Sequence, residues 1–399
     1  MRVVQINGGV FGSTGRIMFG ISDVLRQNGD EALCFSPVTT TNRYREPGNE
    51  YIKIGTFRSR QINVLFSRLT GYEGCFAYFA TRRMLKTISE FKPDIIHLHN
   101  IHGGFVNLPM LFKYIKRNKI KTVWTLHDCW SFTGHCPHFI SIGCEKWKSG
   151  CNNCPLFREY PQSFFDNSKK MYRLKKKWFN GIEKCTLVTP SNWLAGMVNQ
   201  SFLSRYRICT VNNGIDPSVF KPSKSDLRQK HNIEDKKLIL GVSFVWNEKK
   251  GLDIFKRLAS ELSDDYVIVL VGTDENVEKD LPKNIITLRR TQNQSELAGI
   301  YSTADVFVNP TREDTFPTVN IESLACGTPV VTFNTGGSVE IIDPESGITV
   351  DTDDYDGLKA AIVELTGKKA EVTNGCVKRS KAFLNNEKSE EYRALYYFE

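Results

Sequence analysis

Short runs of β-branched and aliphatic residues alternate with longer amphipathic stretches along the whole chain. Short apolar runs favour strands, and apolar residues recurring every three or four positions favour helices. The pattern predicts strands at residues 3–6, 95–99, 121–126, 186–189, 237–242, 266–271, 306–309 and 329–333. It predicts helices at residues 14–27, 108–116, 252–262, 294–302 and 318–325. This alternation is typical of an α/β fold with parallel, helix-covered sheets.

The chain is long enough for two such sheets. A turn-rich segment at 212–217 is followed by mostly polar residues, so we expect a hinge between residues 211 and 234. The expected architecture is two doubly wound Rossmann-like domains, residues 1–212 and 213–385, with a C-terminal helix at 386–399 packing back on the first domain. Open parallel sheets bind ligands beyond the carboxyl ends of their strands. Two facing sheets would therefore form a central ligand cleft.

Composition narrows the class of protein. Of the 399 residues, 40% are apolar and 24% charged, which indicates a globular chain and excludes collagenous and disordered classes. The net charge of +9 is modest for this length, so no nucleic-acid partner is expected. No apolar run is long enough to span a bilayer, and two glycines interrupt the N-terminus before a signal sequence could form. A cytoplasmic enzyme or binding protein is the expected class.

The first predicted strand runs into Gly8 and Gly9, and the loop continues to Arg16 in the first predicted helix. Glycines let backbone N–H groups approach a bound group, and a helix N-terminus favours negative charge. The loop is therefore a candidate anion site, although its spacing matches neither the dinucleotide nor the P-loop pattern. A tight turn without a ligand is the alternative interpretation.

Lys249 and Lys250 precede Gly251 at a second strand-to-helix passage. Cations at a helix N-terminus oppose the macrodipole unless an anion lies between them and the helix. Lys250 is therefore a candidate phosphate ligand, and a solvated lysine pair is the alternative.

Two carboxylates accompany the helix predicted after residue 316. Pro317 suits the first helical position and Gly327 the position just past the end. Glu322 falls inside this otherwise apolar or small helix, where a carboxylate is costly unless the hydroxyls of a ribose donate to it. An exposed Glu is the alternative. Asp314 precedes the helix and could accept from sugar hydroxyls or cap a turn.

Three histidines lie in or directly after predicted strands. His97 and His99 share one face of a predicted strand, and both faces of a buried parallel sheet are covered. At least one of them is expected to be a hydrogen-bonded core residue. His127 ends a strand and is better placed to meet a ligand.

Cysteines gather in a loop rich in Gly and Pro near residues 129–154. Cys136, Cys144, Cys151 and Cys154 are candidate ligands of a structural zinc ion. Only one C-x2-C pair is present, so free thiols and disulfides are the alternatives. No catalytic metal or other catalytic cofactor is expected.

Residues 168–179 form a basic amphipathic segment with Met171, Leu174 and Trp178 on one stripe. Such a helix could lie on an anionic membrane surface or meet a lipid diphosphate acceptor. Packing of the apolar stripe on the sheet, with the lysines in water, is the alternative.

Several motifs together resemble a family 4 glycosyltransferase of the GT-B fold over nearly the whole chain. Besides the glycine loop they are His-Leu-His at 97–99, Thr-Leu-His-Asp at 125–128, Pro-Ser-Asn-Trp at 190–193, Asn-Gly-Ile-Asp at 213–216, Lys-Gly at 250–251, Ala-Asp-Val-Phe-Val at 304–308 and Ala-Cys-Gly-Thr-Pro-Val-Val at 325–331. The family motif E-x7-E corresponds to Asp314 and Glu322.

The resemblance implies that a hexosyl group passes from a nucleotide-diphosphate sugar to a sugar hydroxyl with retention at the anomeric carbon. It implies that Glu322 holds the ribose, Asp314 the donor sugar, Lys250 the diphosphate, Gly9 the diphosphate or leaving group, and His127 the reactive end of the sugar.

The stretch at 312–317 and the Cys-rich insert resemble bacterial exopolysaccharide and lipopolysaccharide enzymes. This implies a saccharide acceptor, expected to be lipid-linked and met at the cytoplasmic face of a membrane.

Three positions depart from the family pattern. The first Glu of the motif is Asp314, which has a shorter side chain. Pro317 stands where the family often has Gly and cannot donate an N–H, so phosphate contacts would fall to Thr318 and Val319. The Arg usual before Lys-Gly is missing, so the diphosphate would be neutralised by Lys250 with Lys249 or Arg16.

Two other functions stay open at this stage. One is a GT-B relative that epimerises UDP-GlcNAc and needs no acceptor. The other is a non-catalytic protein that binds nucleotide sugars or nucleic acid.

Overall fold

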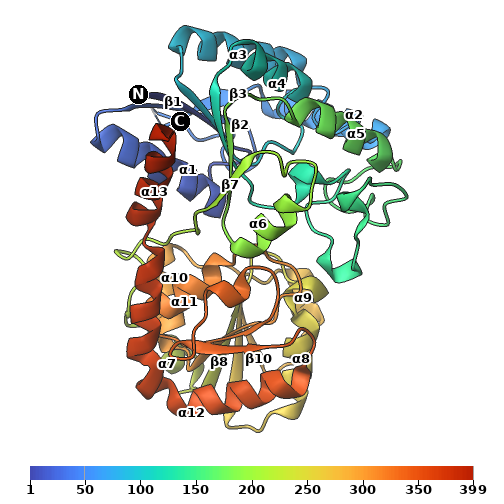
Figure 1. Cartoon of the computed structure of the whole chain (residues 1–399). Coiled ribbons are helices and arrows are strands. Elements are labelled where there is room, and N and C mark those ends of the chain that lie inside the picture. Colours follow the sequence, from blue (N-terminus) through green and yellow to red (C-terminus); the bar gives the residue numbers. More distant parts are fainter. Residues whose placement is uncertain (49, 399) are drawn as a thin grey trace. The chain divides into compact units, whose positions relative to one another are not determined.

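The computed structural model describes residues 1–48 and 50–398. They form two compact units: Met1–Asn212 together with the residues from Asn386 onward, and Asn213–Asn385. Each unit contains one parallel sheet with helices packed against it (Figure 1). The α/β class predicted from the alternation of strands and helices is confirmed.

The N-terminal unit holds a seven-stranded sheet in the order β3-β2-β1-β4-β5-β6-β7. Its strands are β1 (Arg2–Ile6), β2 (Glu31–Pro37), β3 (Ile52–Ile54), β4 (Ile95–Leu98), β5 (Lys121–Thr125), β6 (Cys185–Thr189) and β7 (Arg207–Thr210). Its helices are α1 (Ser13–Gln27), α2 (Phe57–Thr70), α3 (Tyr78–Phe91), α4 (Leu108–Arg117), α5 (Ser168–Phe179), α6 (Asn192–Asn199) and α13 (Asn385–Tyr397). The strand order reverses between β1 and β4, which is where open α/β sheets place ligands.

Helix α1 holds the first glycine-rich loop against the sheet. Its buried residues Ile17, Met18, Ile21 and Leu25 recur at helical spacing and form one apolar face. A Cβ atom at Gly15 would lie 2.4 Å from the carbonyl oxygen of Val10. Only glycine therefore allows the loop after β1 to lie so close to the first turn of α1.

The C-terminal unit holds a six-stranded sheet in the order β10-β9-β8-β11-β12-β13. Its strands are β8 (Lys237–Val242), β9 (Tyr266–Val271), β10 (Ile285–Leu288), β11 (Val306–Asn309), β12 (Val330–Phe333) and β13 (Gly347–Val350). Its helices are α7 (Leu227–His231), α8 (Leu252–Glu261), α9 (Glu275–Lys279), α10 (Gln294–Thr303), α11 (Thr318–Ala325) and α12 (Tyr355–Ser380). Here the strand order reverses between the neighbours β8 and β11.

The strands and helices predicted from the alternation match observed elements to within one residue at each end, and the helix expected at 386–399 is observed as α13 (Asn385–Tyr397). One detail is corrected, because Pro317 is the extended residue before α11 and Thr318 is the first helical one. The strands β2, β3, β7, β10 and β13 and the helices α2, α3, α6, α7 and α9 were not predicted. The missed strands are mostly short or lie toward the sheet edges, where the apolar pattern is weakest.

The basic segment at 168–179 is helix α5, and the structure favours packing over membrane contact for its apolar stripe. Met171, Tyr172 and Phe179 are buried, and Trp178 packs against the core of the N-terminal unit. Only the cationic side of α5 therefore faces solvent.

Helix α13 packs on the sheet of the N-terminal unit. Its Tyr392 and Tyr396 are buried in one apolar cluster with Val3, Ile95 and Val123. The last part of the chain thus completes the core of the first unit.

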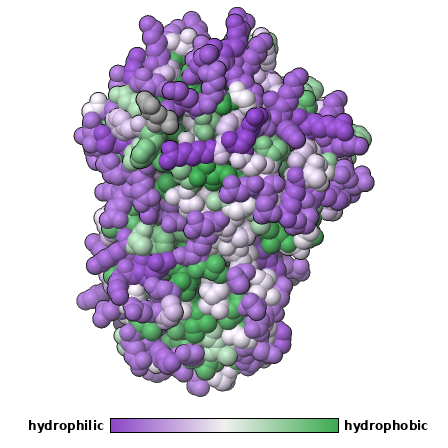
Figure 2. All heavy atoms as spheres, in the orientation of Figure 1, coloured by the Kyte–Doolittle hydropathy of each residue, from purple (hydrophilic) through white to green (hydrophobic). Residues whose placement is uncertain are grey.

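Hydrophilic residues predominate on the face shown in Figure 2, with smaller hydrophobic areas between them. No helix in the described part of the chain is both long and apolar enough to cross a bilayer.

Candidate functional site

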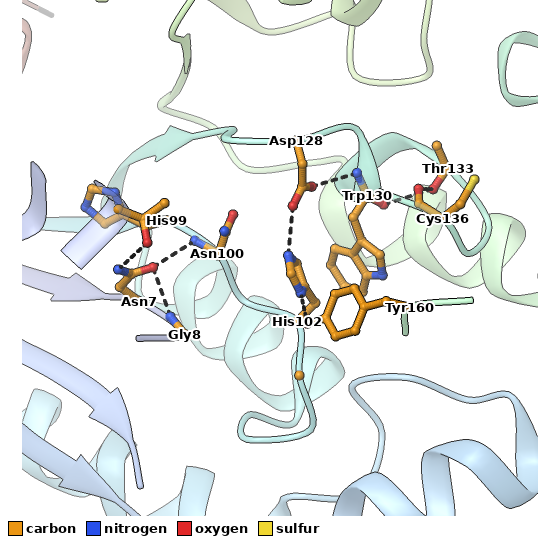
Figure 3. Close-up of polar contacts among 12 residues, drawn as sticks. Asn7, Gly8, His99, Asn100, His102, Asp128, Trp130, Thr133, Cys136 and Tyr160 are labelled. Atoms are coloured by element: carbon orange, nitrogen blue, oxygen red, sulfur yellow. Dashed lines mark hydrogen bonds and ion pairs between the residues drawn. The ribbon is translucent and has the colours of Figure 1, made fainter. Parts of the chain in front are cut away.

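The carboxyl edge of the N-terminal sheet brings the loops after β1 and β4 together. Asn7, the residue after β1, accepts through Oδ1 from the backbone N–H of Gly8 at 2.9 Å and of Asn100 at 3.3 Å (Figure 3). Its Nδ2 donates to the Gly9 carbonyl at 2.8 Å. The glycine loop is thus held at the point where the strand order reverses. Arg16 lies further on, exposed on α1.

Three histidines form a row behind this edge: the rings of His97 and His99 are stacked with centroids 4.1 Å apart, and His99 and His127 are hydrogen-bonded. His97 and His99 are both buried, as expected for at least one of them. His99 Nε2 lies 3.0 Å from Gln5 Oε1, and because an amide oxygen only accepts, this nitrogen donates. His99 Nδ1 then accepts from His127 Nε2 at 3.2 Å. In this tautomer the Nδ1 atom of His127 is a hydrogen-bond acceptor.

Burial keeps these imidazoles neutral. It lowers the pKa of His127 to about 4 and that of His97 to about 3, and it moves the pKa of His99 in the same direction. A neutral His127 can orient a sugar hydroxyl but brings no positive charge to a phosphate.

A second chain of hydrogen bonds runs through Asp128, His102 and Tyr160 (Figure 3). Asp128 Oδ2 accepts from His102 Nε2 at 2.9 Å, and His102 Nδ1 lies 2.8 Å from the Tyr160 hydroxyl. Burial raises the pKa of the Asp128 carboxyl, but the charge and hydrogen bond of His102, together with His138 and the Trp130 N–H, bring the pKa down to about 2. Asp128 is therefore ionised at neutral pH and fixes the orientation of the His102 ring.

The indole of Trp130 lies beside this chain. Its ring centroid is 5.2 Å from that of His102, and its backbone N–H donates to Asp128 Oδ1 at 2.8 Å. A carboxylate and an imidazole flanked by aromatic rings form a surface suited to a sugar, which presents both hydroxyls and apolar C–H faces.

In the C-terminal unit, the loops after β8 and β11 bring together the predicted cation and carboxylate. Lys250 lies in the short turn η4 (Glu248–Lys250), and its Nζ is 2.8 Å from Asp314 Oδ2. Nζ also donates to the Glu313 carbonyl at 3.3 Å. Lys249 pairs with the buried Glu313, 3.5 Å away. Each lysine is therefore paired with a carboxylate, and its side chain stays about one third exposed.

Asp314 also accepts through Oδ1 from the backbone N–H of Phe316 at 3.2 Å. Asp314 therefore caps the turn, as one of its two predicted roles requires, and it does so with one carboxylate oxygen. The other oxygen faces Lys250.

Glu322 on α11 is buried, which rules out the exposed alternative. Its Oε2 accepts from the Tyr301 hydroxyl at 3.3 Å. The backbone N–H groups of Thr318 and Val319 belong to the first turn of α11, where intrahelical acceptors are lacking. The helix therefore presents N–H donors at its start and a carboxylate in its second turn.

Cys136, Cys144, Cys151 and Cys154 line one pocket in the N-terminal unit, together with His135 and Trp147. A hydrogen bond with Cys154 and burial raise the pKa of the Cys136 thiol. None of these four cysteines is in a disulfide bond. Among residues 1–48 and 50–398, no group of three or more His, Cys, Asp or Glu is arranged to hold a metal ion. The structural zinc site stays a prediction, which elemental analysis of the purified protein tests.

Four residues near these sites were not predicted from the sequence: Asn7, His102, Tyr160 and Tyr301. Asn7 directly follows one predicted strand, and His102 comes shortly after another. Their positions could therefore have marked them as candidate site residues. Tyr160 lies in an irregular segment far from any strand end, and no sequence signal marks it.

Two units, each with a Rossmann-like parallel sheet, define the GT-B fold of glycosyltransferases. A family model described as Glycosyltransferase Family 4 matches residues 14–219, just over half of the chain, and one described as Glycosyl transferases group 1 matches residues 236–368. The chain belongs to glycosyltransferase family 4, as its motifs indicated.

Curated relatives are distant. The chain is 26% identical over 267 residues, 65% of its length and 64% of the other, to WcaC of Escherichia coli K12, assigned to colanic acid biosynthesis as a glycosyl transferase. It is 25% identical over 276 residues, 68% and 69% of the two chains, to an uncharacterized 41.2 kDa protein from the cps region of Klebsiella pneumoniae. The alignment with WcaC covers less than two thirds of the WcaC chain. The alignment with a D-inositol 3-phosphate glycosyltransferase from Stackebrandtia nassauensis covers 44% of that protein.

Solved structures share the fold across the whole chain. Sucrose-phosphate synthase from Thermosynechococcus elongatus aligns with a TM-score of 0.73 at 16% identity, covering 99% of this chain and 98% of that one. HepE of Anabaena in complex with UDP aligns with a TM-score of 0.69 at 14% identity, covering 99% of both.

Proposed function

We propose that the protein transfers a hexosyl group from a nucleotide-diphosphate sugar to a saccharide acceptor, with retention at the anomeric carbon. The observation that carries this proposal is the arrangement at the carboxyl edge of the C-terminal sheet, where Lys250, Asp314 and the buried Glu322 follow the adjacent strands β8 and β11. Membership of a glycosyltransferase family supports the reaction class.

In this proposal, each unit carries residues that suit part of the donor. In the C-terminal unit, Glu322 accepts from the ribose hydroxyls, and Asp314 accepts from hydroxyls of the sugar. Lys250 donates to the diphosphate, assisted by Lys249 and by the N–H groups of Thr318 and Val319. The structural neighbour HepE was solved with UDP and with UDP-glucose, which supports a nucleotide sugar as donor.

The N-terminal unit contributes Gly8, Gly9, Arg16 and His127. The N–H groups of the glycine loop and the Arg16 guanidinium suit the diphosphate, and the neutral His127 suits a sugar hydroxyl. The acceptor saccharide meets Asp128 and the residues around it.

The chemistry needs no covalent nucleophile from the protein. The acceptor oxygen forms a bond to the anomeric carbon as the bond from that carbon to the phosphate oxygen breaks. Negative charge develops on the departing nucleoside diphosphate, which takes up the hydroxyl proton or passes it to solvent. Lys250 and the helix α11 N–H groups stabilise that charge, and such preorganised donors are the main source of rate acceleration in comparable sites.

The biological setting we propose is surface polysaccharide synthesis on a lipid-linked acceptor at the cytoplasmic face of a membrane. Support comes from the relatives assigned to colanic acid synthesis and to a cps region.

A thermal-shift panel of UDP, GDP, ADP and their sugars tests the donor assignment. A ligand at about 100 times its dissociation constant adds about 2.7 kcal/mol of stability, which shifts the melting temperature by several degrees. We expect one nucleotide to raise the melting temperature of the protein and of the Glu371→Ala control, which alters an exposed glutamate on α12, but not of Glu322→Ala. A panel without any shift would overturn the proposal.

Product analysis separates the remaining functions. Transfer to a saccharide supports the proposal. Turnover of UDP-GlcNAc to its epimer without an acceptor indicates an epimerase, and nucleotide binding without turnover indicates a non-catalytic binding protein.

A further inference from the structure

Helix α2 carries its apolar stripe on the outside. Ile62, Leu65, Phe66 and Leu69 follow the i, i+3, i+4, i+7 spacing of one helix face, and their side chains are between 45% and 52% exposed. Ser67 is the one buried residue of this helix. Amphipathic helices of globular proteins normally turn such a stripe inward, so this face requires an explanation.

More exposed aromatic residues adjoin the stripe. Phe164 and Phe165 are more than half exposed, and the segment that carries them is fastened to the end of α2, because the Phe164 N–H donates to the Arg68 carbonyl at 2.9 Å. The ring of Phe66 lies 5.6 Å from that of Phe76, just before α3. We call Ile62, Leu65, Phe66, Leu69, Phe164 and Phe165 the α2 surface.

Cations outnumber acids around this surface, where the exposed Asp166 directly follows Phe165. Arg58 and Arg68 lie on α2, and Lys169 and Lys170 lie on the exposed side of the adjoining helix α5. None of these four is in a salt bridge within the described part of the chain. The one acidic residue between positions 57 and 86 is Glu73. Its carboxylate is buried and accepts from the N–H groups of Gly103 and Gly104.

We propose that the α2 surface docks the protein on a bilayer containing anionic lipids. Apolar side chains that enter the boundary between headgroups and acyl chains, flanked by Arg and Lys that meet lipid phosphates, are the pattern of helices that lie in a membrane interface. The cationic rim selects this occupant over a neutral apolar protein face, because burying four unpaired cations against such a face would be costly. This inference deepens the proposed function by naming the surface through which a lipid-linked acceptor is reached.

The α2 surface is tied to the candidate site by two contacts on its inner side. Arg60 of α2 donates through Nε to the Gly103 carbonyl at 3.1 Å. Tyr160, in the same segment as Phe164, reaches His102 through its hydroxyl. Both elements of the docking surface therefore hold the loop that carries His102, within the N-terminal unit.

Sedimentation with vesicles tests the proposal without substrate. The full chain is mixed with phosphatidylcholine vesicles with or without phosphatidylglycerol. We expect binding to the anionic vesicles that weakens with salt. L65S/F66S and, separately, R58E/R68E should each lower the partition coefficient at least about tenfold.

Matched controls sit in the other unit. Val363→Ser removes an apolar side chain of α12 that is 46% exposed, and Lys283→Glu with Lys381→Glu reverses two exposed cations. These variants should bind vesicles as the unmodified protein does. All variants should keep its melting temperature and its transfer to a water-soluble acceptor fragment.

Three results separate the possibilities. No binding of the unmodified protein to anionic vesicles, or equal loss in the controls, overturns the docking surface even if transfer to a soluble acceptor is measured. A dimer that L65S/F66S dissociates also overturns it, and assigns the face to a second copy of the chain. Vesicle binding through the α2 surface without any transfer activity leaves the surface standing and counts against the proposed function.

Discussion

Lys250 and Asp314 form an ion pair at the carboxyl edge of the C-terminal sheet, with Nζ and Oδ2 2.8 Å apart. The pair joins the loops after the neighbouring strands β8 and β11. The side chains are 33% and 24% exposed, and partly exposed pairs contribute little to stability. The proposed function requires this pair to separate, so that Lys250 meets a phosphate of the donor and Asp314 meets its sugar hydroxyls.

Replacing Lys250 by Met should weaken the binding of a nucleoside diphosphate. A charge-assisted hydrogen bond contributes about 1.5–3 kcal/mol, so the dissociation constant measured by calorimetry should rise about 10- to 100-fold. The melting temperature without ligand should change little. The control Lys283→Met, at an exposed position of the same unit, should bind normally. Unchanged affinity in Lys250→Met would remove this residue from the donor site.

Glu322→Gln tests whether the buried carboxylate holds the ribose. The amide keeps the size of the side chain but accepts more weakly than a carboxylate, so the affinity for the preferred nucleotide should fall about tenfold. The 2′-deoxy nucleotide should bind the unmodified protein less tightly than the ribonucleotide, and the variant should discriminate less between them. If the variant and the unmodified protein discriminate equally, Glu322 does not hold the ribose.

The sequence predicted those site residues whose position follows from local rules. Lys250 and Asp314 come after apolar runs, and the carboxyl ends of parallel strands share one edge of a sheet. Glu322 was recognisable as a carboxylate inside an apolar helix. His102 and Tyr160 are 58 positions apart and meet through the fold alone. The outward stripe of α2 was equally hidden, because periodicity identifies an apolar face but not what covers it.

The buried histidines should make stability depend on pH. An ordinary histidine in the unfolded chain has a pKa of about 6.5, and in the folded protein that of His127 is about 4. Between these values the unfolded state binds more protons, so the free energy of unfolding rises with pH across this window and falls on acidification. Each such group contributes a slope of at most about 1.4 kcal/mol per pH unit.

Urea unfolding at several pH values between 4 and 7 measures this slope. His127→Gln should reduce the slope by up to about 1.4 kcal/mol per pH unit, the largest contribution of one group. His231→Gln, at an exposed position on α7, should leave the contribution of the buried histidines unchanged. Equal slopes in His127→Gln and the unmodified protein would mean that the imidazole of His127 titrates alike in both states.

The chain from Asp128 through His102 to Tyr160 should govern the acceptor rather than the donor. Asp128→Asn removes the charge that orients the His102 ring, and the amide nitrogen would oppose the Nε2 proton, so the ring loses its fixed tautomer. We expect the KM for the acceptor to rise about tenfold or more, since a hydrogen bond to a charged group contributes about 1.5–3 kcal/mol. Tyr160→Phe, which removes one neutral hydrogen bond, should have a smaller effect in the same direction.

Hydrolysis of the nucleotide sugar in the absence of acceptor reports on the donor site and should stay unchanged in both variants. A variant that loses hydrolysis and transfer in parallel would instead place Asp128 in donor binding.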